Sequence, residues 1–108
     1  MSRGLSRVLA RVHSLARAGK VRFTHKALCE LASLDFGLDE NDALDILTNL
    51  TAEEWVGRVT SEHTGEWMHI FKPAVAGTAI YVKLILRAEC VVISFHEGGR
   101  GRDKEEQW

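Results

Sequence analysis

Four side chains in the second half of the chain have the chemistry that cleavage of a phosphodiester requires. They belong to Lys72, Tyr81, Lys83 and His96. When the 2′-hydroxyl of RNA attacks the adjacent phosphate, a base takes the hydroxyl proton, an acid protonates the leaving 5′-oxygen, and cations stabilise the phosphorane. Histidine exchanges a proton near neutral pH, lysine holds phosphate charge, and tyrosine stacks on a base or donates a hydrogen bond. These residue types therefore suggest a ribonuclease site.

Strand periodicity brings these residues toward one surface. Residues 78–86 alternate between apolar positions, which should face a core, and Tyr81 and Lys83, which should face the other way. In the next predicted strand, over 90–96, we expect His96 to face the same way as Tyr81, opposite to a buried set of Val91, Ile93 and Phe95. Two more residues of that strand would then join the open face, Val92 and Ser94.

Two earlier strands, predicted over 58–63 and 66–72 with a tight turn at Thr64-Gly65, supply the remaining candidates. Alternation sends Met68, Ile70 and Lys72 to the open face, and it places Trp67, His69 and Phe71 on the buried side. Arg58 is close in sequence to the open face, and we expect it to reach that face. Accessory candidates are Met68, His63 and His69.

Each candidate also has an ordinary structural explanation. A lysine or tyrosine on the solvent face of a sheet, or a histidine at a strand end, is in most proteins simply part of the surface. Arg58 could pair with Glu53 or Glu54, and His69 could be a hydrogen-bonded core residue. The pattern by itself therefore does not establish catalysis.

Three amphipathic helices are predicted before the strands. Apolar residues recur at helical spacing over 5–18, 25–34 and 40–49, and the second and third helices have suitable N-caps in Thr24 and Asp39. Residues 21–23 form a short extended link, residues 51–54 have the form of a capping box, and residues 73–77 form a loop. Helices followed by a meander of strands predict an α+β fold, with the helices on one face of an antiparallel sheet.

Charge is distributed unevenly along the 108 residues, a length that allows one domain. Residues 1–29 contain seven basic residues and no acid, residues 30–66 contain ten acids and one base, and residues 67–108 contain six bases and five acids. The net charge of −1 excludes a histone-like polycation but allows one locally positive face. We expect residues 1–97 to form the domain and residues 98–108 to be a flexible tail.

The sequence contains no recognisable motif for a metal, a cofactor or a membrane. The two cysteines, Cys29 and Cys90, lack metal-binding spacing and are expected to be thiols in a reducing compartment. The apolar runs are too short to cross a bilayer. We therefore expect a cytoplasmic protein that uses neither a metal nor a cofactor.

Residues 5–97 resemble the MqsR-type toxins of bacterial toxin–antitoxin modules. The order and near-constant spacing of short segments carry the resemblance. These segments are AGKVR at 18–22, LTAE at 50–53, HT at 63–64, the W…FKP block at 67–73, Gly77, IYVK at 80–83 and VISF at 92–95.

The resemblance implies a RelE-like fold, in which helices cover one face of a twisted antiparallel sheet and RNA binds the other. It also implies metal-independent endonucleolytic cleavage of mRNA, growth arrest, and neutralisation by a DNA-binding antitoxin. The family's site tyrosine matches Tyr81. Its lysine after the final Ser-Phe pair is His96 here, and its glutamine after the tryptophan is Met68. Arg58 is the candidate substitute for its lysine after the short helix. The catalytic residues would be Tyr81, His96 and Arg58, with RNA phosphate bound by Lys72 and Lys83.

Two alternatives to an mRNA interferase stay open at this point. Because Met68 and His96 replace family residues, the chain could be a non-catalytic module of the same fold that binds RNA or an antitoxin. It could also be an interaction protein that uses its acidic middle segment.

Overall fold

The structure, a computed structural model, describes residues 3–35 and 37–98. Its helices are α1 (Arg3–Arg17), α2 (His25–Ala32), α3 (Glu40–Thr48) and the 3₁₀ turn η1 (Ala52–Glu54). Its strands are β1 (Val21–Phe23), β2 (Trp55–Thr60), β3 (Trp67–Phe71), β4 (Ala74–Val75), β5 (Thr78–Leu86) and β6 (Cys90–Glu97). The predicted tail lies outside the described residues, except for Gly98.

The helices begin where the sequence places their caps. The Thr24 hydroxyl accepts a hydrogen bond from the Ala27 N–H, and Asp39 forms a reciprocal capping box with Asp42 at the start of α3. The Thr51 backbone N–H donates to the Glu54 carboxylate at the start of η1. Local side-chain chemistry therefore fixes the starts of α2, α3 and η1.

The predicted α+β class is confirmed, but the sheet is mixed rather than purely antiparallel. Its strand order is β1-β6-β5-β3-β2, and β4 pairs separately with β5. Residues 21–23 form strand β1, which runs parallel to β6, with Val21 opposite Cys90. The expected loop at 73–77 contains the short strand β4. Residues 21–23 therefore extend the sheet instead of only linking two helices.

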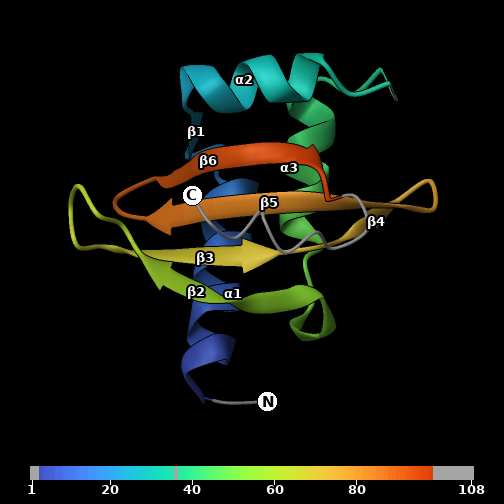
Figure 1. Cartoon of the computed structure of the whole chain (residues 1–108). Coiled ribbons are helices and arrows are strands. Elements are labelled where there is room, and N and C mark those ends of the chain that lie inside the picture. Colours follow the sequence, from blue (N-terminus) through green and yellow to red (C-terminus); the bar gives the residue numbers. More distant parts are fainter. Residues whose placement is uncertain (1–2, 36, 99–108) are drawn as a thin grey trace.

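The helices do not all occupy the same place around the sheet. Helices α1 and α3 lie together behind the sheet in Figure 1, and α2 lies beside the β1–β6 end of it. The core between α1, α3 and the sheet includes Val12, Leu47, Val82 and Phe95, all fully buried. The face toward α1 and α3 is called the helix face below, and the opposite face is called the open face.

A register shift in β6 corrects one detail of the predicted faces. Lys83 pairs with Ser94, but the next residue of β5, Leu84, pairs with Val92, so Ile93 is an extra residue in β6. Val92 consequently joins the core cluster on the helix face, and the expectation that it is on the open face is wrong. Ile93 lines a pocket together with Lys83, and Val91 pairs with Ile85, which lines the same pocket. Neither residue therefore faces the helices as expected. Trp67 was also expected to be buried, but it is 48% exposed.

Candidate functional site

The open face of β5 and β6 carries a central pair of rings, Tyr81 and His96. The two residues are directly opposite each other in the register, so their side chains point to the same side. Their ring centroids are 4.9 Å apart and the ring planes differ by 11°, which is a stacked arrangement. The predicted juxtaposition of these two residues is confirmed.

A backbone hydrogen bond fixes the protonation pattern of the neutral His96 ring. His96 Nδ1 lies 2.9 Å from the carbonyl oxygen of Glu97. Because a carbonyl oxygen can only accept, Nδ1 must carry the proton of this hydrogen bond. The other nitrogen, Nε2, then presents a lone pair, so the neutral ring is arranged to act as a base.

Lys72 approaches the stacked rings from the end of β3. Its Nζ lies 5.9 Å from the centroid of the Tyr81 ring. Its backbone is held by a 2.7 Å hydrogen bond from the Lys72 N–H to the Glu54 carbonyl, which joins the segment after β3 to η1. The ammonium group therefore stands on the same side of the sheet as Tyr81, as the alternation predicts.

Lys83 is much less exposed than a lysine on a sheet surface is expected to be. It is 6% exposed, and Tyr81 is 1% exposed, so this face is partly covered rather than open throughout. Burial, reinforced by the nearby charge of Lys26 and opposed by Glu30, lowers the pKa of Lys83 to about 8. Lys83 consequently gives up a proton more readily than an ordinary lysine.

Helix α2 adds a third lysine that the sequence did not identify as part of this site. Lys26 Nζ lies 2.9 Å from the Ser94 hydroxyl and 2.8 Å from a Glu30 carboxylate oxygen. The other Glu30 oxygen accepts the Phe95 N–H at 2.9 Å, which attaches α2 to the edge of β6. The sequence gives little indication that Lys26 belongs to the site, because Lys26 reaches Ser94 only when β1 and α2 lie beside β6.

Arg58 does not lie on the open face where we expected it. It is opposite His69 in the register between β2 and β3, and His69 is opposite the core residue Leu84. All three therefore point toward the helix face, on the other side of the sheet from Tyr81. A bulge between Trp55 and Gly57 shifts the alternation of β2 and accounts for this outcome.

The accessory candidates are also divided between the two faces. Met68 and His63 line a pocket of about 410 Å³ that also contacts Lys83 and Ile93, so they border the open face. His69 is buried on the helix face, on the Trp67 side of β3 as expected. The open face thus includes Met68 and the region of His63 but not His69.

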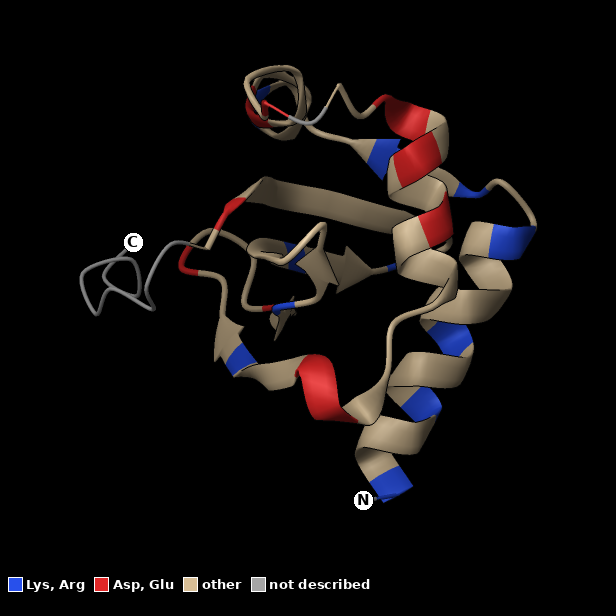
Figure 2. Ribbon diagram, turned by 90° about the vertical axis from the view of Figure 1, so that its right-hand side faces the viewer, with Lys and Arg blue, Asp and Glu red and all other residues tan. Residues whose placement is uncertain are grey.

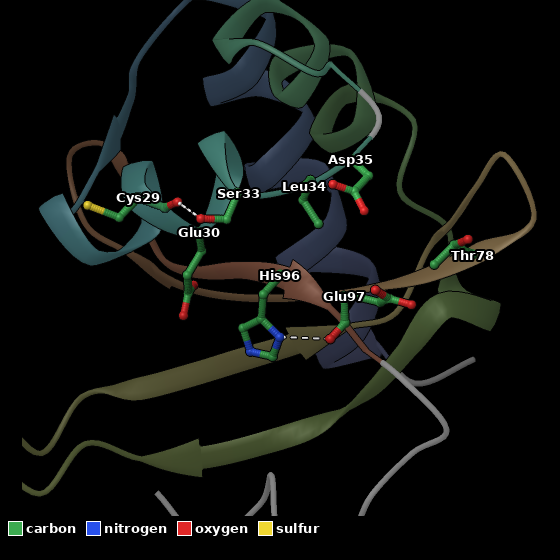
Figure 3. A pocket seen from close by; sticks show the side chains of 8 residues that line it. All are labelled: Cys29, Glu30, Ser33, Leu34, Asp35, Thr78, His96 and Glu97. Atoms are coloured by element: carbon green, nitrogen blue, oxygen red, sulfur yellow. Dashed lines mark hydrogen bonds between the residues drawn. The ribbon is translucent and has the colours of Figure 1, made fainter.

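A second pocket, of about 560 Å³, is lined by His96 together with residues of α2 and of the segment that follows α2. Figure 3 shows the His96 ring between the side chain of Glu30, on α2, and Glu97, the last residue of β6. The pocket contains the carboxylates of Glu30, Asp35 and Glu97. These carboxylates would repel phosphate and would accept hydrogen bonds from base amino groups. Phosphate is therefore expected to approach His96 from the side of Lys72 and Lys83, away from Glu30, which is paired with Lys26.

Comparison with known proteins identifies one family. A family model described as motility quorum-sensing regulator, toxin of MqsA, matches residues 6–97. No curated protein matches the chain. Within residues 3–35 and 37–98, no three potential metal-ligating side chains of His, Cys, Asp or Glu are grouped together. No helix in that part of the chain is long and apolar enough to cross a membrane.

Proposed function

The chain belongs to the MqsR toxin family, and on this premise we propose that it is an mRNA interferase, a metal-independent endoribonuclease that cleaves mRNA in the cytoplasm. A cognate DNA-binding antitoxin would neutralise it. The observation that carries the proposal is the stacked Tyr81–His96 pair with lysines on the same face of the sheet. These are the groups that attack by a 2′-hydroxyl requires.

His96 is the proposed general base. The hydrogen bond from Nδ1 to the Glu97 carbonyl leaves Nε2 free to accept the proton of the 2′-hydroxyl. The 2′-oxygen then forms a bond to phosphorus as the bond from phosphorus to the 5′-oxygen breaks. Tyr81 is a positioning residue, because its ring stacks on the imidazole of His96 and holds that ring in its plane.

The lysines supply positive charge and a proton. Lys72, near the Tyr81 ring, would hold the phosphate oxygens as charge develops on them. Lys26, which contacts Ser94 two residues before His96 and is paired with Glu30, would add to the positive charge there. Lys83, whose pKa is lowered to about 8, is the proposed donor of a proton to the leaving 5′-oxygen. The products would be a 2′,3′-cyclic phosphate and a 5′-hydroxyl.

Cleavage in the presence of a chelator tests this proposal. Purified protein is incubated with mRNA in EDTA, and the variants His96→Ala, Tyr81→Ala and Lys72→Ala are compared with the parent. Loss of the general base is expected to lower the cleavage rate by about 10²- to 10⁴-fold. The matched control is Lys20→Ala, which removes an exposed lysine before β1.

The non-catalytic module remains the second candidate function, because Met68 and His96 stand where the family has glutamine and lysine. Growth separates the two candidates. Induced expression without the antitoxin should arrest cells if the chain is an mRNA interferase, and the His96→Ala variant should not. Normal growth with the unaltered chain, together with RNA binding but no cleavage, would favour the binding module.

A further inference from the structure

A small pocket on the helix face has no part in the proposed cleavage site. Its volume is about 200 Å³, and it lies between the first turns of α1 and strands β2 and β3. The lining residues are Gly4, Leu5, Val8, Trp55, Arg58 and His69. Because Arg58 and His69 point away from the Tyr81 face, a ligand in this pocket would not compete directly with RNA.

Two buried ring nitrogens at this pocket have unmet hydrogen-bonding capacity. Among the described residues, neither His69 Nδ1 nor Trp55 Nε1 has a hydrogen-bond partner. His69 is only 7% exposed, so its ring is held among protein atoms rather than in bulk water. An unsatisfied buried polar group typically costs about 1–3 kcal/mol. A ligand group that reached either nitrogen would remove this cost and stabilise the protein.

The charge around the pocket favours an anion. Arg58 is the charged residue among the six that line it, and none of them is acidic. The guanidinium carbon of Arg58 lies 3.8 Å from the centroid of the Trp67 ring, so the cation is held in place by a cation–π contact. The first turn of α1 also borders the cavity and contains no acidic side chain to offset the positive end of the helix.

The side chains beside the pocket are of the types enriched in protein-binding hot spots. Trp67, whose ring contacts the Arg58 guanidinium, is 48% exposed. Tryptophan and arginine are the residues most enriched where protein partners bind tightly. The volume is smaller than that of ordinary small-molecule sites, which occupy about 300–1,000 Å³, and it suits one inserted side chain better than a whole ligand.

We propose that this pocket receives one acidic side chain of a protein partner, with the carboxylate bound by Arg58 and His69 and an adjacent apolar residue packed on Trp67. Arg58 is exposed, so its guanidinium is accessible, and its N–H donors can bind both oxygens of a carboxylate. The site is separate from the Tyr81 face, so the inference goes beyond the proposed cleavage of RNA and does not depend on it.

Nuclear magnetic resonance of the full chain with two matched peptides tests the inference. The probes are acetyl-Leu-Glu-Leu-amide and its glutamine counterpart, titrated while the Arg58 side-chain, His69 and Trp67 ring signals are followed. The glutamate peptide should give saturable shifts at these three residues. The glutamine peptide should bind roughly tenfold or more weakly, because it lacks the charge.

Two variants locate the binding site. Arg58→Gln should weaken binding of the glutamate peptide by roughly tenfold or more, whereas Arg17→Gln, at the far end of α1, should not. Equal binding of the two peptides, or no saturable shift with either, would overturn the inference without any variant being needed. Tighter binding of inorganic phosphate than of the glutamate peptide would also overturn it, because the pocket would then favour a nucleotide over a protein side chain.

Discussion

The candidate site depends on how two side chains are held, and His96 is the first of them. A strand-end histidine is usually a surface residue, but this one is stacked on Tyr81 and hydrogen-bonded to a backbone carbonyl. Both contacts restrict the ring, and preorganisation of this kind is what distinguishes a catalytic base from an exposed imidazole. Lys83 is the second, because its burial alters the pH range in which it is charged.

The pH dependence of the cleavage rate should follow the protonation state of Lys83. Its pKa is lowered to about 8, so the ammonium form is present below that pH and is lost as the pH rises through it. The cleavage rate is therefore expected to fall above about pH 8. In Lys83→Arg the positive charge persists but the guanidinium does not release its proton, so the cleavage rate should fall and the decline above about pH 8 should disappear. An unchanged alkaline limb in this variant would exclude Lys83 as its source.

A pair of substitutions separates the ring of Tyr81 from its hydroxyl group. If the ring supports His96, Tyr81→Phe should retain cleavage within about threefold, whereas Tyr81→Ala should lose about 10²-fold or more. The measurement is the single-turnover rate on an mRNA fragment. A Phe variant as inactive as the Ala variant would show that the hydroxyl group is essential and that stacking is not sufficient.

At the scale of elements, the β4–β5 turn offers a direct test of local backbone strain. Ala76 has φ of 53° and Gly77 has φ of 81° in a two-residue turn closed by the Val75–Thr78 pair. Asparagine tolerates positive φ better than alanine, and Asn-Gly is the favoured sequence for such turns. Ala76→Asn should therefore raise the free energy of unfolding by about 1 kcal/mol in urea titrations.

The control for the turn is Ala74→Asn, two residues earlier in β4, where the chain is extended and exposed. That change should not stabilise the protein. Equal stabilisation by both substitutions would show that the effect of Ala76→Asn does not arise from the turn.

The sequence predicted the elements better than their registers. Caps at Thr24 and Asp39 and the apolar alternation of β5 are local signals, and the structure agrees with them. The extra residue at Ile93 and the irregularity after Trp55 have no local signature, because a bulge depends on which residues the neighbouring strand presents. Arg58 was expected on the open face only because it is close to that face in the sequence, and its pairing with His69 was not predicted. Tyr81 and His96 were assigned to the correct face.

Contacts between distant segments were the least predictable from sequence. Lys26 joins the site only because β1 pairs in parallel with β6 and α2 then lies along the β6 edge. A three-residue strand such as 21–23 carries too few side chains to show an alternation. A basic residue in the first third of the chain could not be connected to the sheet by periodicity alone.

At the scale of the whole molecule, the basic and acidic segments of the sequence form different helices. Figure 2 shows Lys and Arg along α1 and Asp and Glu along α3 beside it. Neither helix lies on the open face, where Lys26, Lys72 and Lys83 are located. A net charge of −1 is thus compatible with a locally positive site, and the acidic helix is kept away from the proposed RNA path.

An ion pair between residues that are distant in the sequence should make the free energy of unfolding depend on pH in the acidic range. Arg87, after β5, donates to both Glu66 carboxylate oxygens at 2.9 and 2.7 Å, and this contact lowers the Glu66 pKa to about 2 from its ordinary 4.5. A carboxylate with a lowered pKa stabilises the fold above its ordinary pKa and loses that contribution as the pH falls toward the folded value.

The variant Glu66→Gln should therefore be less stable than the parent above about pH 5, and the two should converge as the pH approaches 2. Urea unfolding at a series of pH values measures the difference. Parallel stability curves across this range would show that the ion pair contributes nothing in solution.

The central claim is that the open face cleaves RNA by 2′-hydroxyl attack, and the chemistry of the product ends tests it most directly. The measurement is end-group analysis of an mRNA fragment cut in EDTA by the parent chain, with the double variant of Tyr81→Ala and His96→Ala as the background. We predict 2′,3′-cyclic phosphate and 5′-hydroxyl ends that are absent with the double variant. Ends carrying a 5′-phosphate and a 3′-hydroxyl, or cleavage no greater than that of the double variant, would contradict the account.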